Sequence, residues 1–419
     1  MWDTRSGLWF CTKIPLIMIF HTSTRIFAHI DCNSFYASCE VLRDPSLKGK
    51  CVCVWDQIVI AASYEAKKYG VKTGTPLWEA ERMLGKKLVK RIPDHSWYRQ
   101  VSERLMQYLT AKLGKIEVFS IDELFAELTN ISGRYDDFAE SLKEEIYHDI
   151  GISVSIGISN TRIRAKMFGD LYKPYGSYVD FNVESIEWLF RTLAVTEVPY
   201  IARGNSERLG STVKTVYDFY AMEGRRVSEI LGRNGVILWL ELHGVDSWVP
   251  HDTEKKRKSI ACTRSFNHEM SSNPHFLWRQ ILMNFERAYD TMLSEKQGAR
   301  VIWLLLRTKE FTYQTRAIDM GETNIDKSRM VTLLREMLLS IFDKNCIYRT
   351  TGVTFSELSP FTPKQLSVFD IDDRVQVKNE KISNALTKLK ERFWENVVHQ
   401  GFIRESKVSR ELPTIFEVG

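Results

Sequence analysis

The first half of the chain alternates between short apolar runs and longer stretches with apolar residues at helical spacing. Runs typical of strands lie at 25–30, 51–55, 58–61, 116–121 and 153–158. Stretches typical of amphipathic helices lie at 64–69, 101–113 and 138–150. Helices and strands mixed in this way predict an α+β domain rather than a doubly wound nucleotide-binding fold.

The residue pattern in the second half of the chain predicts a helical region and a second α+β unit. Short helices are expected at 186–193, 213–220, 227–231 and 236–242. A second α+β unit is expected beyond them, with helices at 274–293 and 328–342 and a strand at 300–306. The charged segment 252–258 between these parts has a basic centre. It is either a solvated tether or a tether that lies along a phosphate backbone.

Two acidic clusters stand where apolar runs end. Asp31 follows the first run, and Asp122 and Glu123 follow the run at 116–121. A carboxylate at the end of a buried strand must be solvated, paired or bound to a metal, because its desolvation is otherwise costly. Either cluster alone could simply cap a strand or begin a helix. Three carboxylates from distant segments, however, suit a pair of Mg²⁺ ions of the kind that assist phosphoryl or nucleotidyl transfer.

Composition narrows the class of protein only modestly. The chain has 419 residues, 44% of them hydrophobic, which is enough for several domains with cores of their own. A formal net charge of +5 permits a nucleic-acid partner without requiring one. Seven cysteines without a repeated spacing indicate free thiols in a reducing compartment, so a cytoplasmic protein is expected.

Neither export nor a membrane anchor is expected. The apolar run at 14–20 is short and is interrupted by Pro15, and residues 1–24 are interpreted as an N-terminal extension. No stretch approaches the roughly 20 apolar residues that a membrane span needs.

Four motifs follow one another in a fixed order. They are D-C-N-S-F-Y-A-S-C-E at 31–40, A-S-Y-E-A-K-K-Y-G-V-K-T-G at 62–74, S-I-D-E at 120–123 and K-P-Y-G at 173–176. Together they resemble the motifs of the Y-family, or translesion, DNA polymerases. The resemblance is strongest to the branch that contains the catalytic subunit of bacterial DNA polymerase V, and it extends from about residue 26 to about residue 369.

The resemblance implies an α+β, multidomain, right-hand polymerase with palm, fingers, a small helical thumb and an α+β little finger. The boundaries that it implies are 25–34 and 95–182 for the palm, 35–94 for the fingers, 183–251 for the thumb, 252–258 for a linker, 259–361 for the little finger and 362–419 for a C-terminal tail.

The acidic clusters gain a specific role from the resemblance. It implies that Asp31, Asp122 and Glu123 are catalytic and that they bind two Mg²⁺ ions together with the backbone carbonyl of Cys32. One ion would lower the pKa of a primer 3′-hydroxyl, and the other would neutralise the triphosphate and the departing pyrophosphate.

Five further residues are implied as contacts of the incoming nucleotide. Tyr36, next to Phe35, resembles the steric gate that collides with a 2′-hydroxyl, although an aromatic pair is also an ordinary core feature. Tyr64 and Lys67 lie three residues apart, and therefore on one helix face, where they could contact the β and γ phosphates. Lys173 is the third phosphate candidate.

The chain departs from the family pattern at three points. Ala61 replaces a hydroxyl residue that often precedes the tyrosine of the second motif by three positions, so one triphosphate hydrogen bond is in doubt. Only residues 55–57 stand where relatives usually have a longer fingers segment, so lesion preference cannot be carried over. In the thumb, Tyr200–Gly204 replaces a glycine-rich hairpin, which puts a backbone contact to a DNA phosphate in doubt.

The segment 365–369 resembles the peptide that binds the bacterial sliding clamp. Gln365 would orient the peptide, and Leu366, Val368 and Phe369 would provide apolar anchors. An incidental apolar linker is the alternative, because five residues match easily by chance. The apolar spacing at 382–393 predicts a further helix of undetermined role.

The sequence therefore predicts a low-fidelity, template-directed DNA polymerase in DNA repair and the SOS response. Its expected partners are primer–template DNA, dNTPs and the sliding clamp, and the need for an accessory subunit is left open. The sequence shows no second cluster of carboxylates of the kind that an exonuclease would need, so proofreading is not expected. A catalytically impaired DNA- or clamp-binding scaffold and a palm-type nucleotidyl cyclase are the alternatives, although intact Asp31, Asp122 and Glu123 weigh against the scaffold.

Overall fold

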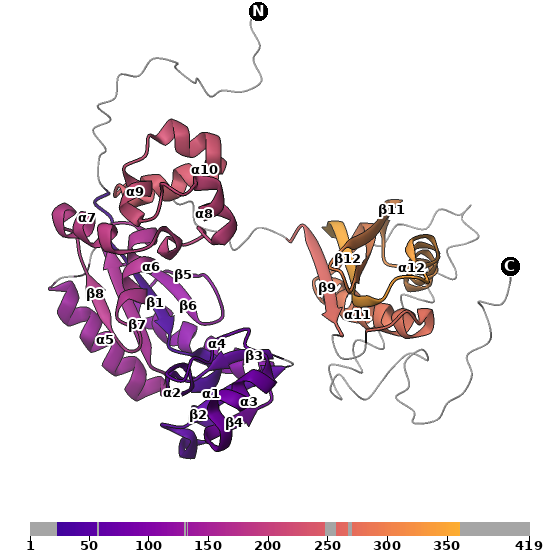
Figure 1. Ribbon diagram of the computed structural model, residues 1–419, viewed down its shortest axis with the longest axis horizontal. Helices are drawn as coiled ribbons and strands as arrows, with labels where there is room; N and C mark the ends of the chain where they lie inside the picture. The colour runs from indigo at the N-terminus through magenta and orange to yellow at the C-terminus, as the bar shows by residue number, and fades with distance from the viewer. Residues whose placement is uncertain are drawn as a thin grey trace, which may run out of the picture. The chain divides into compact units, whose positions relative to one another are not determined.

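The computed structural model describes residues 23–56, 58–129, 131, 133–247, 257–266 and 270–360 (Figure 1). The chain divides into two compact units, Met1–Asp252 and Thr253–Gly419. Among the described residues, no helix is long and apolar enough to cross a membrane. The clamp-like segment 365–369, the helix expected at 382–393 and most of the expected linker and N-terminal extension lie outside them.

A five-stranded sheet is the centre of the first unit. Its strands, in spatial order, are β5 (Ile116–Val118), β6 (Glu123–Glu127), β1 (Phe27–Cys32), β7 (Val154–Ser159) and β8 (Ser177–Val179). β1 runs antiparallel to both of its neighbours, and the register places Asp31 opposite Glu123 on one side and Ser155 on the other. Residues that lie opposite one another share a face of the sheet, so this register brings the two acidic clusters together.

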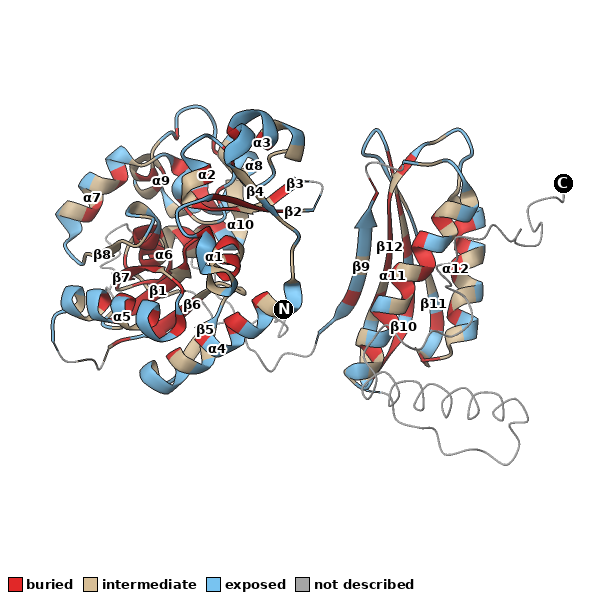
Figure 2. Cartoon of the chain, turned by 90° about the horizontal axis from the view of Figure 1, so that it is seen from below, coloured by how far each residue is buried: buried red, intermediate tan, exposed pale blue. Residues whose placement is uncertain are grey.

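The two faces of this sheet have different roles. Ala28, Ile30 and Cys32 of β1 point into a core completed by two long helices, α4 (His95–Leu113) and α5 (Tyr135–Ile150). Because side chains alternate along a strand, His29 and Asp31 lie on the other face. Helix α6 (Arg162–Leu171) packs on that face against β1 and β7. The strands in the middle of the sheet are mostly buried (Figure 2).

One sequence expectation about this sheet is wrong. Residues 116–121 do not form one strand that Asp122 and Glu123 close. The strand β5 ends at Val118, a turn follows, and Glu123 begins β6. The N–H groups of Phe119 and Ser120 both donate to the carbonyl of Glu123, which closes a tight hairpin.

A smaller three-stranded sheet, in the order β3-β2-β4, carries the second motif. The elements of this region are α1 (Phe35–Arg43), η1 (Pro45–Leu47), β2 (Cys51–Asp56), β3 (Ile58–Ala62), α2 (Tyr64–Lys67), α3 (Leu77–Leu84), η2 (Gly85–Lys87) and β4 (Leu88–Arg91). The hydroxyl of Ser63 caps α2 by accepting from the N–H of Ala66. This cap fixes the start of α2 and therefore the positions of Tyr64 and Lys67 on it.

The first unit ends in a helical region with its own core around Phe190 and Phe219. Its elements are α7 (Val183–Thr192), η3 (Val195–Glu197), α8 (Arg203–Leu209), α9 (Val216–Tyr220) and α10 (Gly224–Leu242). The two helices expected at 227–231 and 236–242 correspond to α10, which kinks at Gly232 with φ 67°.

The second unit is a four-stranded antiparallel sheet with two helices on it. Its elements are β9 (Ser259–Ser265), α11 (Pro274–Ser294), β10 (Gln297–Thr308), β11 (Tyr313–Asn324), α12 (Lys327–Ile341) and β12 (Tyr348–Pro360), and the strand order is β11-β10-β12-β9. The buried faces of α11 and α12 pack against the sheet (Figure 2). The sequence predicted both helices and β10 but missed the other three strands.

Candidate active site

The carboxylates predicted from distant segments meet on one face of the central sheet. One ligand atom from each of His29, Asp31 and Glu123 lies within 4.8 Å of the other two. His29 joins this group because it precedes Asp31 by two residues and therefore points to the same face.

Asp122 lies beside this group, at the end of the β5–β6 turn. The hydroxyl of Ser120 donates to its carboxylate. Its backbone carbonyl accepts from the N–H of Cys32 at 2.9 Å, which fixes the turn against the end of β1. Asp122 is not part of the group with atoms within 4.8 Å, although its charge acts on Asp31.

Glu123 is held by two donors at a single oxygen. Nε2 of His29 lies 3.0 Å from Oε2, and the ammonium of Lys166 on α6 pairs with the same oxygen. Burial alone would raise the pKa of Glu123, but the hydrogen bonds and charges of these two residues lower it to about 2. Glu123 is therefore a carboxylate at neutral pH, and Nε2 of His29 must carry the proton that it donates.

Asp31 is paired with Lys173, the lysine of the fourth motif. Nζ of Lys173 lies 2.8 Å from Asp31 and 2.6 Å from Asp170, which is the last acidic residue of α6. Burial raises the pKa of Asp31, and the adjacent ammonium opposes that shift. Burial lowers the pKa of Lys173, but the charges of Asp31 and Asp170 outweigh it and raise that pKa overall.

The other candidate phosphate ligands gather just beyond the end of β1. The hydroxyl of Tyr64 donates to Oδ1 of Asn33 at 3.4 Å, and Nζ of Lys67 donates to the hydroxyl of Ser34 at 2.8 Å. Burial lowers the pKa of Lys67, and the charge of Lys173 adds to this effect. The two ammonium groups are therefore close enough for the charge of one to act on the other.

The aromatic pair of the first motif divides between two environments. Phe35 is buried in the core. Tyr36 is half-buried, and its ring stacks on Tyr98 with centroids 4.4 Å apart. Burial raises the pKa of Tyr36, and the negative charge of Asp122 contributes, so the ring is close to the acidic residues.

The approach of α6 to the sheet depends on two glycines. A Cβ on Gly157 of β7 would lie 2.1 Å from the carbonyl oxygen of Ala165 and 2.2 Å from the amide nitrogen of Gly169. A Cβ on Gly169 would lie 3.0 Å from Nδ1 of His29. The close contact allows α6 to present Lys166 to Glu123 and Asp170 to Lys173.

Sequence reasoning missed His29, Lys166 and Asp170. The spacing of two between His29 and Asp31 was an available signal, because a strand places such residues on one face. Lys166 and Asp170 lie on a helix that was not predicted, so no sequence pattern placed them near the site.

The donor set suits hard divalent cations. Asp31, Asp122 and Glu123 supply carboxylate oxygens, which Mg²⁺ prefers, while His29 already uses Nε2 as a donor to Glu123. Hydrogen bonds that orient a carboxylate, such as those to Oε2 of Glu123, are usual around metal sites.

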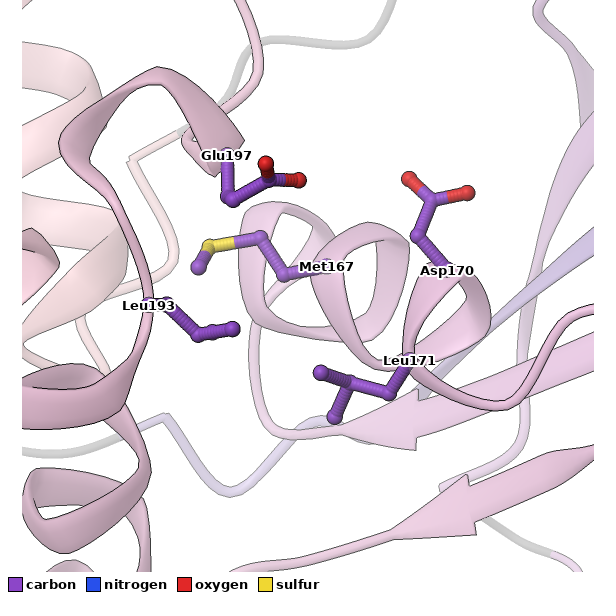
Figure 3. Close-up of a pocket in the computed structure, with 5 residues that line it drawn as sticks. All are labelled: Met167, Asp170, Leu171, Leu193 and Glu197. Atoms are coloured by element: carbon purple, nitrogen blue, oxygen red, sulfur yellow. The ribbon is translucent and has the colours of Figure 1, made fainter. Parts of the chain in front are cut away.

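A separate pocket lies between α6 and η3, lined by Met167, Asp170, Leu171, Leu193 and Glu197. Figure 3 shows the carboxylates of Glu197 and Asp170 on one side and the leucines on the other. Asp170 in this lining pairs with the candidate site residue Lys173. The pocket is therefore a neighbour of the carboxylate site rather than its centre.

Comparison with known proteins identifies the family. Residues 30–170 match the impB/mucB/samB family, and residues 257–368 match the C-terminal domain of the same family. DNA polymerase IV of Bacillus velezensis is 26% identical over 411 residues, covering 94% of this chain and 96% of that protein. DNA polymerase IV 1 of Bacillus subtilis is 27% identical over 410 residues, with the same coverage.

Solved structures agree with these sequence matches. The "Y-family DNA polymerase chimera Dbh-Dpo4(243-245)-Dbh" superposes with a TM-score of 0.66 at 25% identity, covering 79% of this chain and 98% of that one. The "Insertion ternary complex of Dbh DNA polymerase" has a TM-score of 0.52 at 24% identity, with the same coverage. The expected α+β polymerase fold with a C-terminal little finger is confirmed.

One finer expectation is corrected. The relatives named above are DNA polymerase IV enzymes, not members of the branch that contains the catalytic subunit of DNA polymerase V. The motifs therefore identified the family but indicated the wrong branch. The chain belongs to the impB/mucB/samB family, the Y family of DNA polymerases, whose members are DNA-directed DNA polymerases that carry out translesion synthesis.

Proposed function

We propose that the chain transfers nucleotides from dNTPs to a primer 3′-hydroxyl with low fidelity, at the site formed by Asp31, Asp122 and Glu123. The observation that carries the proposal is the register of β1 and β6, which sets Asp31 opposite Glu123. Paired carboxylates on a rigid sheet hold their geometry better than carboxylates on loops.

These carboxylates, with the backbone carbonyl of Cys32, would hold two Mg²⁺ ions. When bound, the ions would supply charge stabilisation for the attacking and leaving oxygens of the displacement. His29 and Lys166 would keep Oε2 of Glu123 occupied, so that Glu123 offers Oε1 to a cation. Enzymes of this family use divalent metal ions, which agrees with the donor set.

The incoming nucleotide would lie on the Asp31 side of the site. Tyr64, Lys67 and Lys173 would bind its triphosphate, because they bring a hydroxyl and two ammonium groups to the end of β1. Tyr36 would lie against the sugar, with Phe35 packed beneath it in the core.

Tyr36→Ala tests the assignment of the steric gate. We expect the preference for dNTPs over rNTPs to fall by about 100-fold, because the ring no longer collides with a 2′-hydroxyl. Single-nucleotide insertion kinetics with matched dNTP and rNTP measure the ratio. Tyr36→Phe keeps the ring and should keep the preference; undiminished discrimination in Tyr36→Ala would assign the gate to another residue.

Lys166→Met tests whether the pairing with Glu123 matters for catalysis. We expect kcat for nucleotide addition to fall by about 10- to 100-fold, the usual effect of removing a partner of a metal ligand. Lys166→Arg retains a charged donor and should recover most of the rate. Equal kcat values for Lys166→Met and the wild type would show that the ion pair between Lys166 and Glu123 is not needed for catalysis.

The boundaries expected for palm, fingers, thumb, linker and little finger remain part of this proposal. Primer–template DNA would bind to the palm, thumb and little finger. Two of the similar solved structures are described as a ternary and a binary complex of a DNA polymerase.

The bacterial sliding clamp is proposed as a further partner, through residues 365–369. The support for this proposal is the sequence alone: Gln365 is followed by Leu366, Val368 and Phe369 as apolar anchors.

Primer extension on a DNA template with Mg²⁺ and four dNTPs tests the proposed function. The wild type should add template-matched nucleotides stepwise, and Asp122→Ala/Glu123→Ala should add none. Clear primer–template binding without extension by the wild type, also in the presence of the clamp, would favour a DNA-binding scaffold of the same family.

A further inference from the structure

Lys143 is a charged residue on the buried face of α5, and only 3% of its surface is exposed. An ammonium group in such a place is costly unless it is paired and hydrogen-bonded. Its Nζ lies 2.9 Å from Oε2 of Glu140 and donates to the backbone carbonyl of Tyr175 at 3.0 Å. A helix residue thus holds a backbone group of the loop between α6 and β8.

This loop, residues 172–176, carries the candidate phosphate ligand Lys173. Tyr175 adopts φ 62° in it, a backbone conformation that is rare for tyrosine and must be imposed by the surroundings. The carbonyl of Gly176 accepts from the N–H of Ile156 at 3.1 Å, which attaches the end of the loop to β7. Two successive backbone carbonyls of the loop are therefore fixed, one by α5 and one by β7.

Helix α5 lies beside β7 and β8 and contacts the loop at further points (Figure 1). Nζ of Lys143 lies 5.0 Å from the centre of the Tyr175 ring, and this ring meets Tyr147 edge-on with centroids 6.0 Å apart. The carboxylate of Glu140, which pairs with Lys143, also accepts from the hydroxyl of Ser177 at the start of β8. The segment that follows Lys173 is therefore attached to α5 through both backbone and side chains.

The attachment of Lys173 itself differs from these contacts. Its ammonium pairs with Asp31 at 2.8 Å and with Asp170 at 2.6 Å. A triphosphate bound by Lys173 would compete with Asp31 for this ammonium, so the pairing with Asp31 cannot hold the loop while a nucleotide is bound. The contacts of Lys143 and Ile156 involve no candidate ligand of the nucleotide, and they can persist.

We propose that Lys143 is a positioning residue for the incoming nucleotide: its buried ammonium holds the carbonyl of Tyr175 and thereby keeps Lys173 where it can bind the triphosphate. This inference rests on the proposed function, in which Lys173 is a triphosphate ligand. Lys143 would act through the loop and would not touch the nucleotide.

Hydrogen exchange of the protein without DNA tests whether Lys143 holds the loop. Lys143→Met and Lys143→Gln remove the ammonium, and the glutamine keeps a polar group at the buried position so that the fold is retained if the methionine variant unfolds. We expect the amides of residues 172–177 to exchange about 10-fold faster in both variants. Lys143→Arg keeps a charged donor and should exchange at nearly the wild-type rate.

Single-turnover insertion of one dNTP tests whether the loop positions Lys173. We expect Lys143→Met and Lys143→Gln to raise the half-saturating dNTP concentration roughly 10-fold and to change the maximal rate by less than about 3-fold. Lys143→Arg should recover most of the affinity. In a Lys173→Ala background, Lys143→Met should have little further effect, because both substitutions would remove the same contact.

Lys112→Met is the matched control, because it removes an ion pair between α4 and Glu145 of the same helix α5. It should leave the half-saturating dNTP concentration unchanged. A wild-type value in Lys143→Met and Lys143→Gln, with a lowered unfolding midpoint, would overturn the proposal and leave Lys143 with a purely structural role. Additive effects of Lys143→Met and Lys173→Ala would overturn it too. A wild type that inserted no nucleotide would refute the proposed function, whereas hydrogen exchange would still show whether Lys143 holds the loop.

Discussion

Asp31→Asn is expected to lower the rate of nucleotide addition on the order of 10³-fold or more. The substitution keeps the shape of the side chain but removes the charge that faces Glu123 across β1 and β6. A neutral amide is a poor ligand for a hard divalent cation, and it no longer pairs with Lys173. Single-turnover insertion of one dNTP measures the effect without a contribution from product release.

The control for this prediction is an aspartate away from the site. Asp137→Asn changes an exposed residue in the first turn of α5 and should leave the rate unchanged. Primer–template affinity should be similar in both variants and the wild type. An Asp31→Asn enzyme within about 10-fold of the wild-type rate would contradict the assignment, because loss of a metal ligand costs several kcal/mol of charge stabilisation.

Gly157→Ala is expected to give the largest loss of stability, about 3 kcal/mol or more. The added methyl would meet backbone atoms of Ala165 and Gly169, which cannot rotate away as a flexible side chain can. α6 would have to move off the sheet, and Lys166 would move with it. Chemical denaturation monitored by circular dichroism measures the change in the free energy of unfolding.

Gly204→Ala provides the matched comparison. Gly204 lies in α8, and no atom stands within 4 Å of a Cβ built on it, so alanine should be neutral or slightly stabilising. Similar stabilities for the two glycine variants would show that the contact between α6 and β7 is looser than the structure indicates.

The sequence was sufficient to predict elements in which apolar residues recur at regular spacing. It was insufficient to predict strands that are mostly polar. Helices α4, α5, α11 and α12 each bury one stripe of apolar residues, so the helical spacing of these residues was visible in the sequence. β11 (Tyr313–Asn324) is exposed along most of its length, and its pattern gave little sign of a strand. The turn after Val118 was missed because apolar Phe119 and Ile121 continue the apolar run through it.

The candidate site was predictable to the extent that its residues lie in short motifs. Asp31, Glu123 and Lys173 were named from the sequence, and the structure brings them together on one face. The catalytic roles of Asp31 and Glu123 and the phosphate-binding role of Lys173 stay predictions. Lys166 could not be linked to Glu123, because that link depends on how α6 packs over the sheet. The link between His29 and Glu123 depends instead on the register of β1 and β6.

The number of divalent ions bound by the wild type and by the carboxylate variants tests most directly whether Asp31, Asp122 and Glu123 form a metal site. Mn²⁺ binding can be counted by electron paramagnetic resonance in a complex of the protein with a 3′-deoxy primer, template and matched dNTP. Two tightly bound ions are expected for the wild type, and fewer for Asp31→Asn and Asp122→Ala/Glu123→Ala. The same number of ions in all three proteins would contradict a site built from these carboxylates.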